Sequence, residues 1–534
     1  MTTKYLKIAA ALLVGVSGLN SCSELELDQY FGDGGTGMAV SAEQKNDVVA
    51  VAPERMEAAV TGAFSAYGVF NQMGDDRHSD FGYPAIMLAL EHRGQDLVGL
   101  NTGYNWFNYY LDYEDIDYSY YMVRYIWGPL YNQIKAANDV CALVSAETAA
   151  SDAATDDLKF YRAQGVAARA FSYFNLAQLF QFTYKGNESK PCVPLILDTN
   201  ADEAAANGCA RSTVQQVYDQ ILADLNEAVT LLTGNSYQRA DKRYIDLYTA
   251  KGLRARVYLV MNMFDEAKAD AQDVINNGGF TPLSLDEAGK PGFNNLKEGH
   301  NIMWGVKMAE LDEAVLTGIC NFPSHMGSLN YGYATVGAWR KVNKALYNSI
   351  PATDVRKNWF LDADGKSAGL TPEQQEYVTS QGAPAYTQVK FAPYKGVVGT
   401  STNASDIPLM RVEEMYYIVA EAEAQSGSTT TLTNFVKTYR DPSFAPSGDA
   451  KEVVWNQRRV EFFGEGLSYF DLQRLKKPVD RRGGGYERGL VFNIPADDAA
   501  RIYPIPMSEI NANKLISDAD NNPTASLPKP VADK

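Results

Sequence analysis

Apolar residues recur at helical spacing through most of the first half of the chain, from about residue 42 to residue 277. One predicted helix carries a stripe of small residues four and three positions apart, which lets a partner helix approach closely. The stripe is Ala163, Ala167, Ala170, Phe174 and Ala177. The helix after it, from Val214 to Leu232, follows a capping box that we assign to Ser212 and Gln215. Such helix pairs predict a tetratricopeptide-like arrangement with degenerate repeats.

The pattern changes between residues 281 and 407, where Gly, Pro, Asn and aromatic residues replace the helical period. Short apolar runs such as 302–308 predict a few strands there. Helical spacing resumes at residue 409 and again from 452 to 475. We therefore expect a mainly α fold, a tetratricopeptide-like helical-pair superdomain with a loop-rich insertion containing short strands.

This organisation divides the chain into five expected regions. A signal peptide and a lipidated flexible spacer precede the N-terminal helical region, the loop-rich insertion and a C-terminal helical region that packs on the first. Their expected bounds are residues 1–21, 22–41, 42–280, 281–407 and 408–534.

The first residues have the features of a bacterial export signal. Lys4 and Lys7 precede a short apolar core, residues 8–16, which is too short to cross a bilayer. The run Leu19-Asn20-Ser21-Cys22 then places a cysteine where a lipoprotein is cleaved and acylated. We expect lipidation at Cys22, since two or more acyl chains give stable membrane attachment. The alternative is an ordinary secretory signal in which this cysteine is incidental.

Charge and cysteine content narrow the classes of partner. The chain has 534 residues with 48 Lys and Arg against 65 Asp and Glu, a formal net charge of −17. This acidity argues against nucleic acid as a partner, because phosphate binding needs a cationic face. No pair of cysteines has C-x-x-C spacing, which disfavours a zinc or redox motif. Cys192 and Cys209 flank a loop, and both a disulfide and free thiols remain open.

Aromatic residues are concentrated between Tyr104 and Tyr131, where 12 of 28 residues are aromatic, against 11% of the whole chain. A sugar ring has apolar C–H faces and a rim of hydroxyls, so its site needs an aromatic face beside amide or charged groups. Tyr104, Asn105 and Trp106 supply both. From 118 to 131 the aromatic residues keep helical spacing, which favours packing in the core.

Two further loops are candidates for the same kind of contact. Asn330, Tyr331 and Tyr333 surround a glycine, and Asp76 and Arg77 lie in a charged turn between apolar runs. Long loops on a rigid scaffold often carry binding residues, although each loop alone also fits a solvated turn. Our hypothesis is that the rings at positions 104 and 106 stack against a sugar, and that Asn105 and these five residues bond to it or flank it.

The motifs that suggest catalysis or metal binding lack the context that their chemistry needs. Glu114, Asp115 and Asp117 crowd one short stretch, whereas a glycosidase places its two carboxylates on opposite sides of the scissile bond. The tract 32–37 matches G-x-G-x-x-G but follows no buried strand. Residues 362–373 resemble a calcium loop without its turn glycine. We predict a protein that is not an enzyme and uses no metal or cofactor.

The C-terminal part carries three motifs of a known family. Residues 409–416, with Ala420-Glu421-Ala422 one turn on, resemble the R-x-x-E…Y-x-E-A helix of the SusD/RagB family of Bacteroidetes outer-membrane lipoproteins. Residues 457–474 look like its E-R-x-x-E-L-x-F-E-G-x-R-x-x-D-L-x-R signature. Residues 503–510 are similar to its closing P-I-P-x-x-E motif. The resemblance covers nearly the whole chain after Cys22.

Within the signature, charged residues recur at near-helical spacing, and we expect them to form a network that ties the last helices together. They are Arg458, Glu461, Glu465, Asp471 and Arg474. Three residues depart from the family pattern: Gln457 replaces the usual Glu, Gly464 the usual Phe, and Ser468 stands where Arg is common.

The resemblance implies a lipid-anchored outer-membrane protein that faces the cell exterior and captures a nutrient, usually a glycan. It also implies a partner, a SusC-like TonB-dependent transporter to which the glycan is delivered. Two alternatives remain open. One is a RagB-like peptide-binding lipoprotein of the same kind of uptake system, and the other is a periplasmic tetratricopeptide scaffold.

Overall fold

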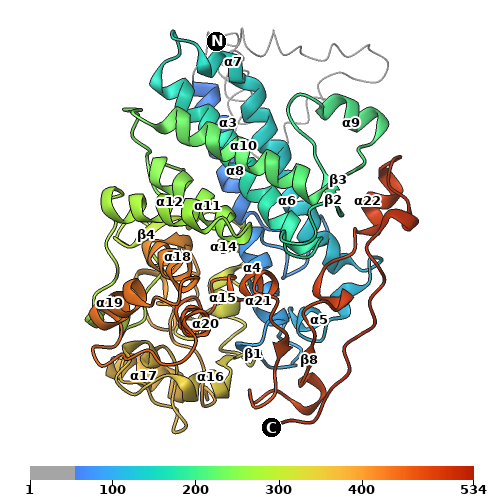
Figure 1. Cartoon of the computed structure of the whole chain (residues 1–534). Coiled ribbons are helices and arrows are strands. Elements are labelled where there is room, and N and C mark those ends of the chain that lie inside the picture. The colour runs from blue at the N-terminus through green and yellow to red at the C-terminus, as the bar shows by residue number, and fades with distance from the viewer. Residues whose placement is uncertain (1–53) are drawn as a thin grey trace, which may run out of the picture. The chain divides into compact units, whose positions relative to one another are not determined.

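The computed structural model describes residues 54–534, shown in colour in Figure 1. The expected signal peptide, the lipid acceptor Cys22 and the Gly-rich tract at 32–37 lie outside the described residues. The described part folds mainly into helices, with short two-stranded ladders between them. The predicted mainly α fold class is thereby confirmed.

The N-terminal helices pack in neighbouring pairs (Figure 1). Helix α8 (Asp156–Leu179) lies between α6 (Tyr121–Leu143) and α10 (Val214–Leu232), and α11 (Leu247–Val260) packs on α12 (Phe264–Asn277). The alanine stripe of α8 is buried, so the neighbouring helices approach its backbone closely. The other helices of this region are α3 (Glu54–Ser65), α4 (Tyr83–Arg93), α5 (Asn108–Leu111), α7 (Ala146–Ala150) and α9 (Ala201–Asn207).

The capping box of α10 lies one residue later than expected. The backbone N–H of Gln216 donates to Thr213 Oγ1 at 3.2 Å, and the Thr213 N–H donates to Gln216 Oε1 at 2.8 Å. The assignment to Ser212 and Gln215 is therefore wrong. Strand β3 (Arg211–Thr213) extends through position 212, so the helix begins only after its last residue.

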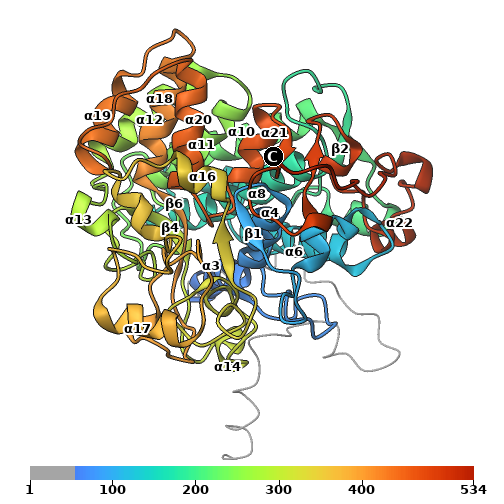
Figure 2. The same ribbon diagram turned by 90° about the horizontal axis from the view of Figure 1, so that it is seen from below.

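Four antiparallel ladders of two strands each occur in residues 54–534. They pair β1 (Leu97–Gly99) with β5 (Arg340–Val342), β2 (Pro191–Pro194) with β3, β4 (Ile302–Val306) with β6 (Ile407–Arg411), and β7 (Val479–Asp480) with β8 (Asn493–Ile494). Figure 2 shows the yellow strand β5 beside the blue strand β1. This ladder joins the loop-rich segment to the N-terminal region, and it places Gly99 opposite Arg340.

Residues between 281 and 407 form only short helices, separated by loops, as expected for the insertion. They are α13 (Leu285–Ala288), α14 (Glu313–Leu316), α15 (Phe322–Met326), α16 (Lys344–Ser349) and α17 (Pro372–Ser380). Longer helices return after β6, where α18 packs on α12. The C-terminal helices are α18 (Val412–Ala424), α19 (Thr430–Tyr439), α20 (Ala450–Glu461), α21 (Ser468–Arg474) and α22 (Met507–Ala512).

The expected charge network is present around α20 and α21, and it has two parts. In the first, Glu461 accepts hydrogen bonds from Arg440 Nε at 2.8 Å and from Nη1 of Arg411 and Arg356 at 3.2 Å each. Burial alone raises the pKa of Glu461, but the three guanidiniums, Arg440 foremost, outweigh it and hold the pKa well below its ordinary range. Glu465 Oε2 accepts from Arg411 Nε at 2.8 Å.

In the second part, Asp471 accepts hydrogen bonds from Nε of Arg458 and Arg474 at 2.8 Å each, and Arg474 also donates to Glu421 at 2.7 Å. All four side chains are buried. Charge-assisted bonds of this kind link α18, α20 and α21. The family signature therefore serves the scaffold.

Two departures from the family pattern have a local reason. Gln457 Oε1 accepts a hydrogen bond from Arg356, so an amide joins the network where a carboxylate is usual. Gly464 has a φ of +79°, and a Cβ there would lie 2.5 Å from Met326 Cε and 2.9 Å from the Phe391 ring. Glycine meets both constraints because it has no Cβ.

Candidate ligand-binding surface

Three loops that are distant in the sequence meet at one surface. The ring of Trp106 lies 4.5 Å from that of His78, and the ring of Tyr333 lies 6.4 Å from those of Trp106 and Tyr104, centroid to centroid. We call these four residues the aromatic cluster. They come from the turn before α4, the segment between β1 and α5, and the loop between α15 and β5. The structure thus brings together three of the residues expected to contact a sugar.

The cluster presents ring surface to solvent above a buried floor. Tyr104 is 53% exposed, Trp106 is half-buried, and Tyr331, two positions before Tyr333, is 51% exposed. Tyr333 is only 8% exposed, and its hydroxyl is hydrogen-bonded to His78 Nδ1. Tyr104 and Trp106 are thus the more exposed rings of the cluster, and Tyr333 is the buried one.

Two residues expected to contact a ligand are buried, and both hold the loops in place. Asn105 donates to the Leu100 carbonyl at 3.0 Å, and its Oδ1 accepts from the Phe107 N–H at 3.1 Å. Asn330 donates to the Pro323 carbonyl at 3.0 Å and to Asn403 Oδ1 at 2.8 Å. These amides satisfy the loop backbone, so they position the exposed rings and do not face solvent.

The charged turn lies at the edge of the cluster. Asp76 adopts a φ of +51°, its N–H donates to Asn71 Oδ1 at 2.7 Å, and its side chain is exposed. The Arg77 guanidinium lies 4.3 Å from the centre of the Tyr121 ring. Arg77 therefore reaches away from Trp106, toward the start of α6.

Three buried basic side chains, Arg340, His92 and His325, lie beneath the cluster and have few hydrogen-bond partners. Arg340 is fully buried and donates to Asn105 Oδ1 at 3.0 Å, but its Nε and Nη1 have no hydrogen-bond partner among the described residues. Burial lowers the pKa of Arg340 to about 9. Burial also lowers the pKa of His92 and His325 well below 6.5, so both rings are neutral. The loop that carries Asn105 and Trp106 therefore rests on an incompletely paired cation.

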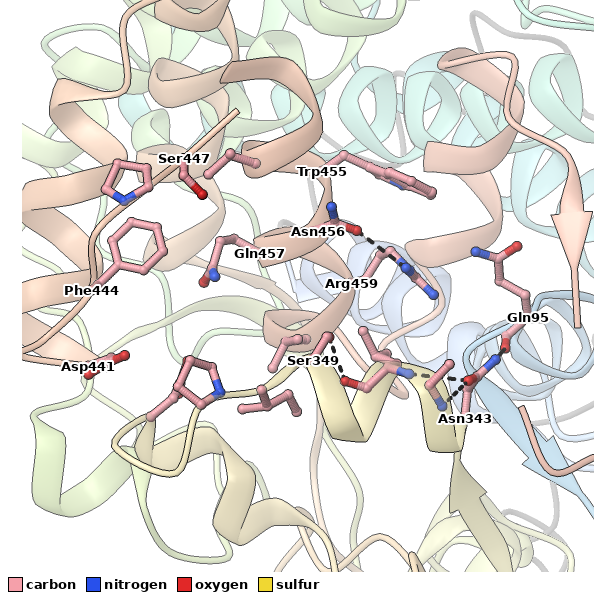
Figure 3. Close-up of a pocket in the computed structure, with 18 of the residues that line it drawn as sticks. Gln95, Asn343, Ser349, Asp441, Phe444, Ser447, Trp455, Asn456, Gln457 and Arg459 are labelled. Atoms are coloured by element: carbon pink, nitrogen blue, oxygen red, sulfur yellow. Dashed lines mark hydrogen bonds between the residues drawn. The ribbon is translucent and has the colours of Figure 1, made fainter. Parts of the chain in front are cut away.

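A hollow of about 860 Å³ lies elsewhere, between α16, α20 and the loop after α19 (Figure 3). Its Trp455 is half-buried, but the charged groups of Arg459 and Lys477 lie 5.0 and 4.6 Å from the indole ring centre. Asn343, labelled in the same view, donates to the Gln95 carbonyl at 2.8 Å. The polar and aromatic groups of this hollow thus already engage one another.

The side chains that suggested catalysis or calcium binding have structural partners. Asp115 forms a fully buried ion pair with Arg93 at 2.5 Å. Asp362 Oδ1 accepts the backbone N–H groups of Asp364 and Lys366 at 2.9 Å each, which closes a turn. No group of three or more His, Cys, Asp or Glu side chains within the described part of the chain is arranged to hold a metal.

Cys192 and Cys209 are free thiols, which answers the question left open by their spacing.

Across residues 54–534, no helix has both the length and the apolar character needed to cross a membrane.

Sequence reasoning misses two features of this surface. His78 joins the cluster only because the loops meet, and no local pattern encodes that contact. The expectation of core packing from 118 to 131 is right for Tyr125 and Trp127 but wrong for Tyr120, which is 47% exposed. Tyr120 precedes the first residue of α6, Tyr121, so helical spacing does not apply to it.

Two family models match the chain. A model described as starch-binding and associating with the outer membrane matches residues 85–259, and the SusD family model matches residues 333–523. The chain belongs to the SusD/RagB family. The first matched region includes Tyr104 and Trp106, and the second includes Tyr333 and the charge network around Glu461.

Particular relatives and solved structures agree with this. SusD-like protein P2 of Formosa agariphila is 27% identical over 443 residues, which are 75% of this chain and 80% of the relative. A SusD-like carbohydrate binding protein from Bacteroides vulgatus has a TM-score of 0.71 at 21% identity, covering 88% of this chain and 97% of that one. Surface glycan-binding protein A from Bacteroides thetaiotaomicron, solved with laminarihexaose, has a TM-score of 0.63 at 18% identity, covering 86% and 98%.

Proposed function

We propose that this protein is a cell-surface lipoprotein that binds a glycan and delivers it to a SusC-like TonB-dependent transporter in the outer membrane. Residues 1–21 serve as its signal peptide, Cys22 carries the lipid, and residues 22–41 tether the folded part, which faces the cell exterior. Tyr104, Trp106 and Tyr331 contact the glycan, and Tyr333 supports them. The protein captures its ligand without catalysis.

The exposed aromatic rings carry this proposal. An aromatic face packs against the apolar C–H face of a pyranose, and a solvent-exposed tyrosine adds a hydroxyl for the sugar rim. Tyr104, Trp106 and Tyr331 supply such rings from two loops, and Asp76 supplies an exposed carboxylate at the edge. In this proposal Asn105 and Asn330 fix the loops, and Arg77 flanks the site.

The family and its solved members favour a glycan over a peptide. One matched model is described as starch-binding, one neighbour was solved with laminarihexaose, and another is described as a laminarin binding SusD-like protein. That last neighbour has a TM-score of 0.60 at 19% identity and covers 88% of this chain and 99% of its own. Oligosaccharides from laminarin and from starch are therefore the first probes to test.

The test is calorimetry of the purified protein with laminarihexaose, maltohexaose and a panel of peptides. We expect one of the glycans to bind and Trp106→Ala to weaken it at least about tenfold, as for other central aromatic contacts. Trp455→Ala is the matched control, because Trp455 is also half-buried but lies in the hollow of Figure 3. We expect it to leave the affinity unchanged.

The opposite pattern, in which Trp455→Ala abolishes binding and Trp106→Ala does not, would move the site to that hollow. Binding of peptides alone would favour a RagB-like peptide-binding protein. For the location, protease added to intact cells should cleave the protein. Complete protection would instead indicate a periplasmic scaffold.

A further inference from the structure

A groove of about 620 Å³ lies beside the aromatic cluster, and of the residues that line it only Arg77 has a place in the function proposed above. It is lined by Asp75 and Arg77, by the segment that leads into α6 with the first turn of that helix, and by the start of α22. The Met507 N–H donates to the Tyr118 carbonyl at 2.9 Å, which joins the start of α22 to the segment before α6. The groove is thus built from three segments that hold one another.

Two contacts connect this groove to the aromatic cluster. Arg77 directly precedes His78 of the cluster, and its guanidinium lies 4.3 Å from the centre of the Tyr121 ring. Tyr109, three positions after Trp106, has its ring 6.1 Å from that of Tyr121, centroid to centroid. Tyr121 therefore contacts residues one and three positions from His78 and Trp106, which places the groove next to the cluster.

The groove offers aromatic surface beside an ion pair. Tyr118, Tyr120 and Tyr121 line it, and Tyr120 is 47% exposed. Arg124 forms an ion pair with Asp75, and the Tyr125 hydroxyl donates to the same carboxylate at 2.9 Å. Exposed rings beside paired charges suit an uncharged ligand with apolar faces and many hydroxyls.

We infer that this groove is a second stretch of the glycan-binding surface, which holds the continuation of a saccharide chain whose first units lie on the aromatic cluster. This inference rests on the function proposed above and adds a second contact region for the same ligand. Each stretch contributes its own contacts, so a chain long enough to reach both binds more tightly than one that reaches only the cluster.

The test compares trisaccharides and hexasaccharides of the laminarin and starch series by calorimetry. For the wild type we expect the hexasaccharide of the series that binds to be the tighter ligand. Tyr120→Ala should remove about three- to tenfold of that advantage and leave the trisaccharide affinity unchanged, the size expected for one aromatic contact. Tyr120→Phe should retain the advantage. Trp106→Ala should weaken both lengths.

Tyr121→Ala tests a second residue that lines the groove, by the same comparison of the two saccharide lengths. Its matched control is Tyr258→Ala on α11, since Tyr258 is also half-buried with an arginine 5.8 Å from its ring centre. Thermal unfolding of each variant reports whether it folds. Equal affinity of the two lengths, or an advantage that survives both Tyr120→Ala and Tyr121→Ala in folded protein, overturns the inference but leaves the proposed function intact. Failure of every glycan to bind overturns both.

Discussion

The buried charges around Glu461 and the buried cation at Arg340 differ in how they are paired. Glu461 receives hydrogen bonds from three arginines, and Arg411 reaches a second carboxylate at Glu465. Arg340, equally buried, has one side-chain hydrogen bond, to Asn105 in the binding loop. The first group lies among the C-terminal helices, and the second lies under the aromatic cluster.

The C-terminal helices are therefore held more firmly than the loop above Arg340. A buried ion stabilises a fold only when partners replace its lost hydration, and an unpaired one costs free energy. The network of Glu461 meets that condition, so it supports the helices of the family signature. Arg340 does not, so the loop that carries Trp106 rests on a less stable base.

The largest expected effect is loss of a cation from the paired network. Arg411→Met leaves Glu461 and Glu465 short of partners, and we expect unfolding in urea to show a loss of about 3–5 kcal/mol. Lys395→Ala is the control, because Lys395 forms an exposed pair with Glu310. Exposed pairs contribute little, so this variant should not change the unfolding midpoint measurably. Similar losses in both variants would contradict the assignment of the network as scaffold.

Acid should reduce the stability contributed by the two regions over different pH ranges. The pKa of Glu461 is depressed from 4.5 in the folded protein, so its stabilisation is complete above that pH and is lost as the pH falls toward the folded value. The pKa values of His92 and His325 are depressed from 6.5, so the unfolded chain binds those protons first and stability declines as the pH falls through 6.5.

Urea midpoints measured against pH should therefore show two separate declines. His92→Gln should reduce the one that begins near pH 6.5 and leave the one below pH 4.5. Glu461→Gln should reduce the decline below pH 4.5 and leave the one that begins near pH 6.5. It should also lower the stability of the protein throughout the pH range. A single decline that responds to neither variant would show that these groups do not control the acid response.

A much smaller change in stability than that of Arg411→Met is expected from Arg340→Met, its matched partner. It removes a buried guanidinium whose Nε and Nη1 have no partner in the described part of the chain. We expect a stability within about 1 kcal/mol of the wild type, or above it, because an unpaired charge is replaced by an apolar side chain. A loss as large as that of Arg411→Met would show that the cation has partners in solution.

Helical spacing predicts the scaffold well, because burial of one face per helix is a local property of the sequence. The alanine stripe of α8 and the contacts of Asp471 with Arg458 and Arg474 follow from it, whereas the three arginines that pair with Glu461 lie on other segments and are not predicted. The cap of α10 is misplaced by one residue because β3 extends to Thr213, and strand pairing is not visible in local spacing.

The binding surface is predictable only in part. The exposed rings of Tyr104, Trp106 and Tyr331 follow from aromatic residues on Gly- and Asn-rich loops. Whether an amide in such a loop faces a ligand or the backbone depends on neighbours distant in the sequence. Asn105 and Asn330 bond to loop atoms, and His78 meets Trp106 only in the folded chain.

Gly464 connects the scaffold to the variable part of the molecule. Its missing β-carbon leaves room for Met326, the residue after His325, whose ring stacks 4.8 Å from Tyr333 of the aromatic cluster. A larger side chain at this position would require the Met326 side chain and the Phe391 ring to move, and it would have to adopt a left-handed backbone. The residue at position 464 therefore couples the family signature to the packing next to Tyr333.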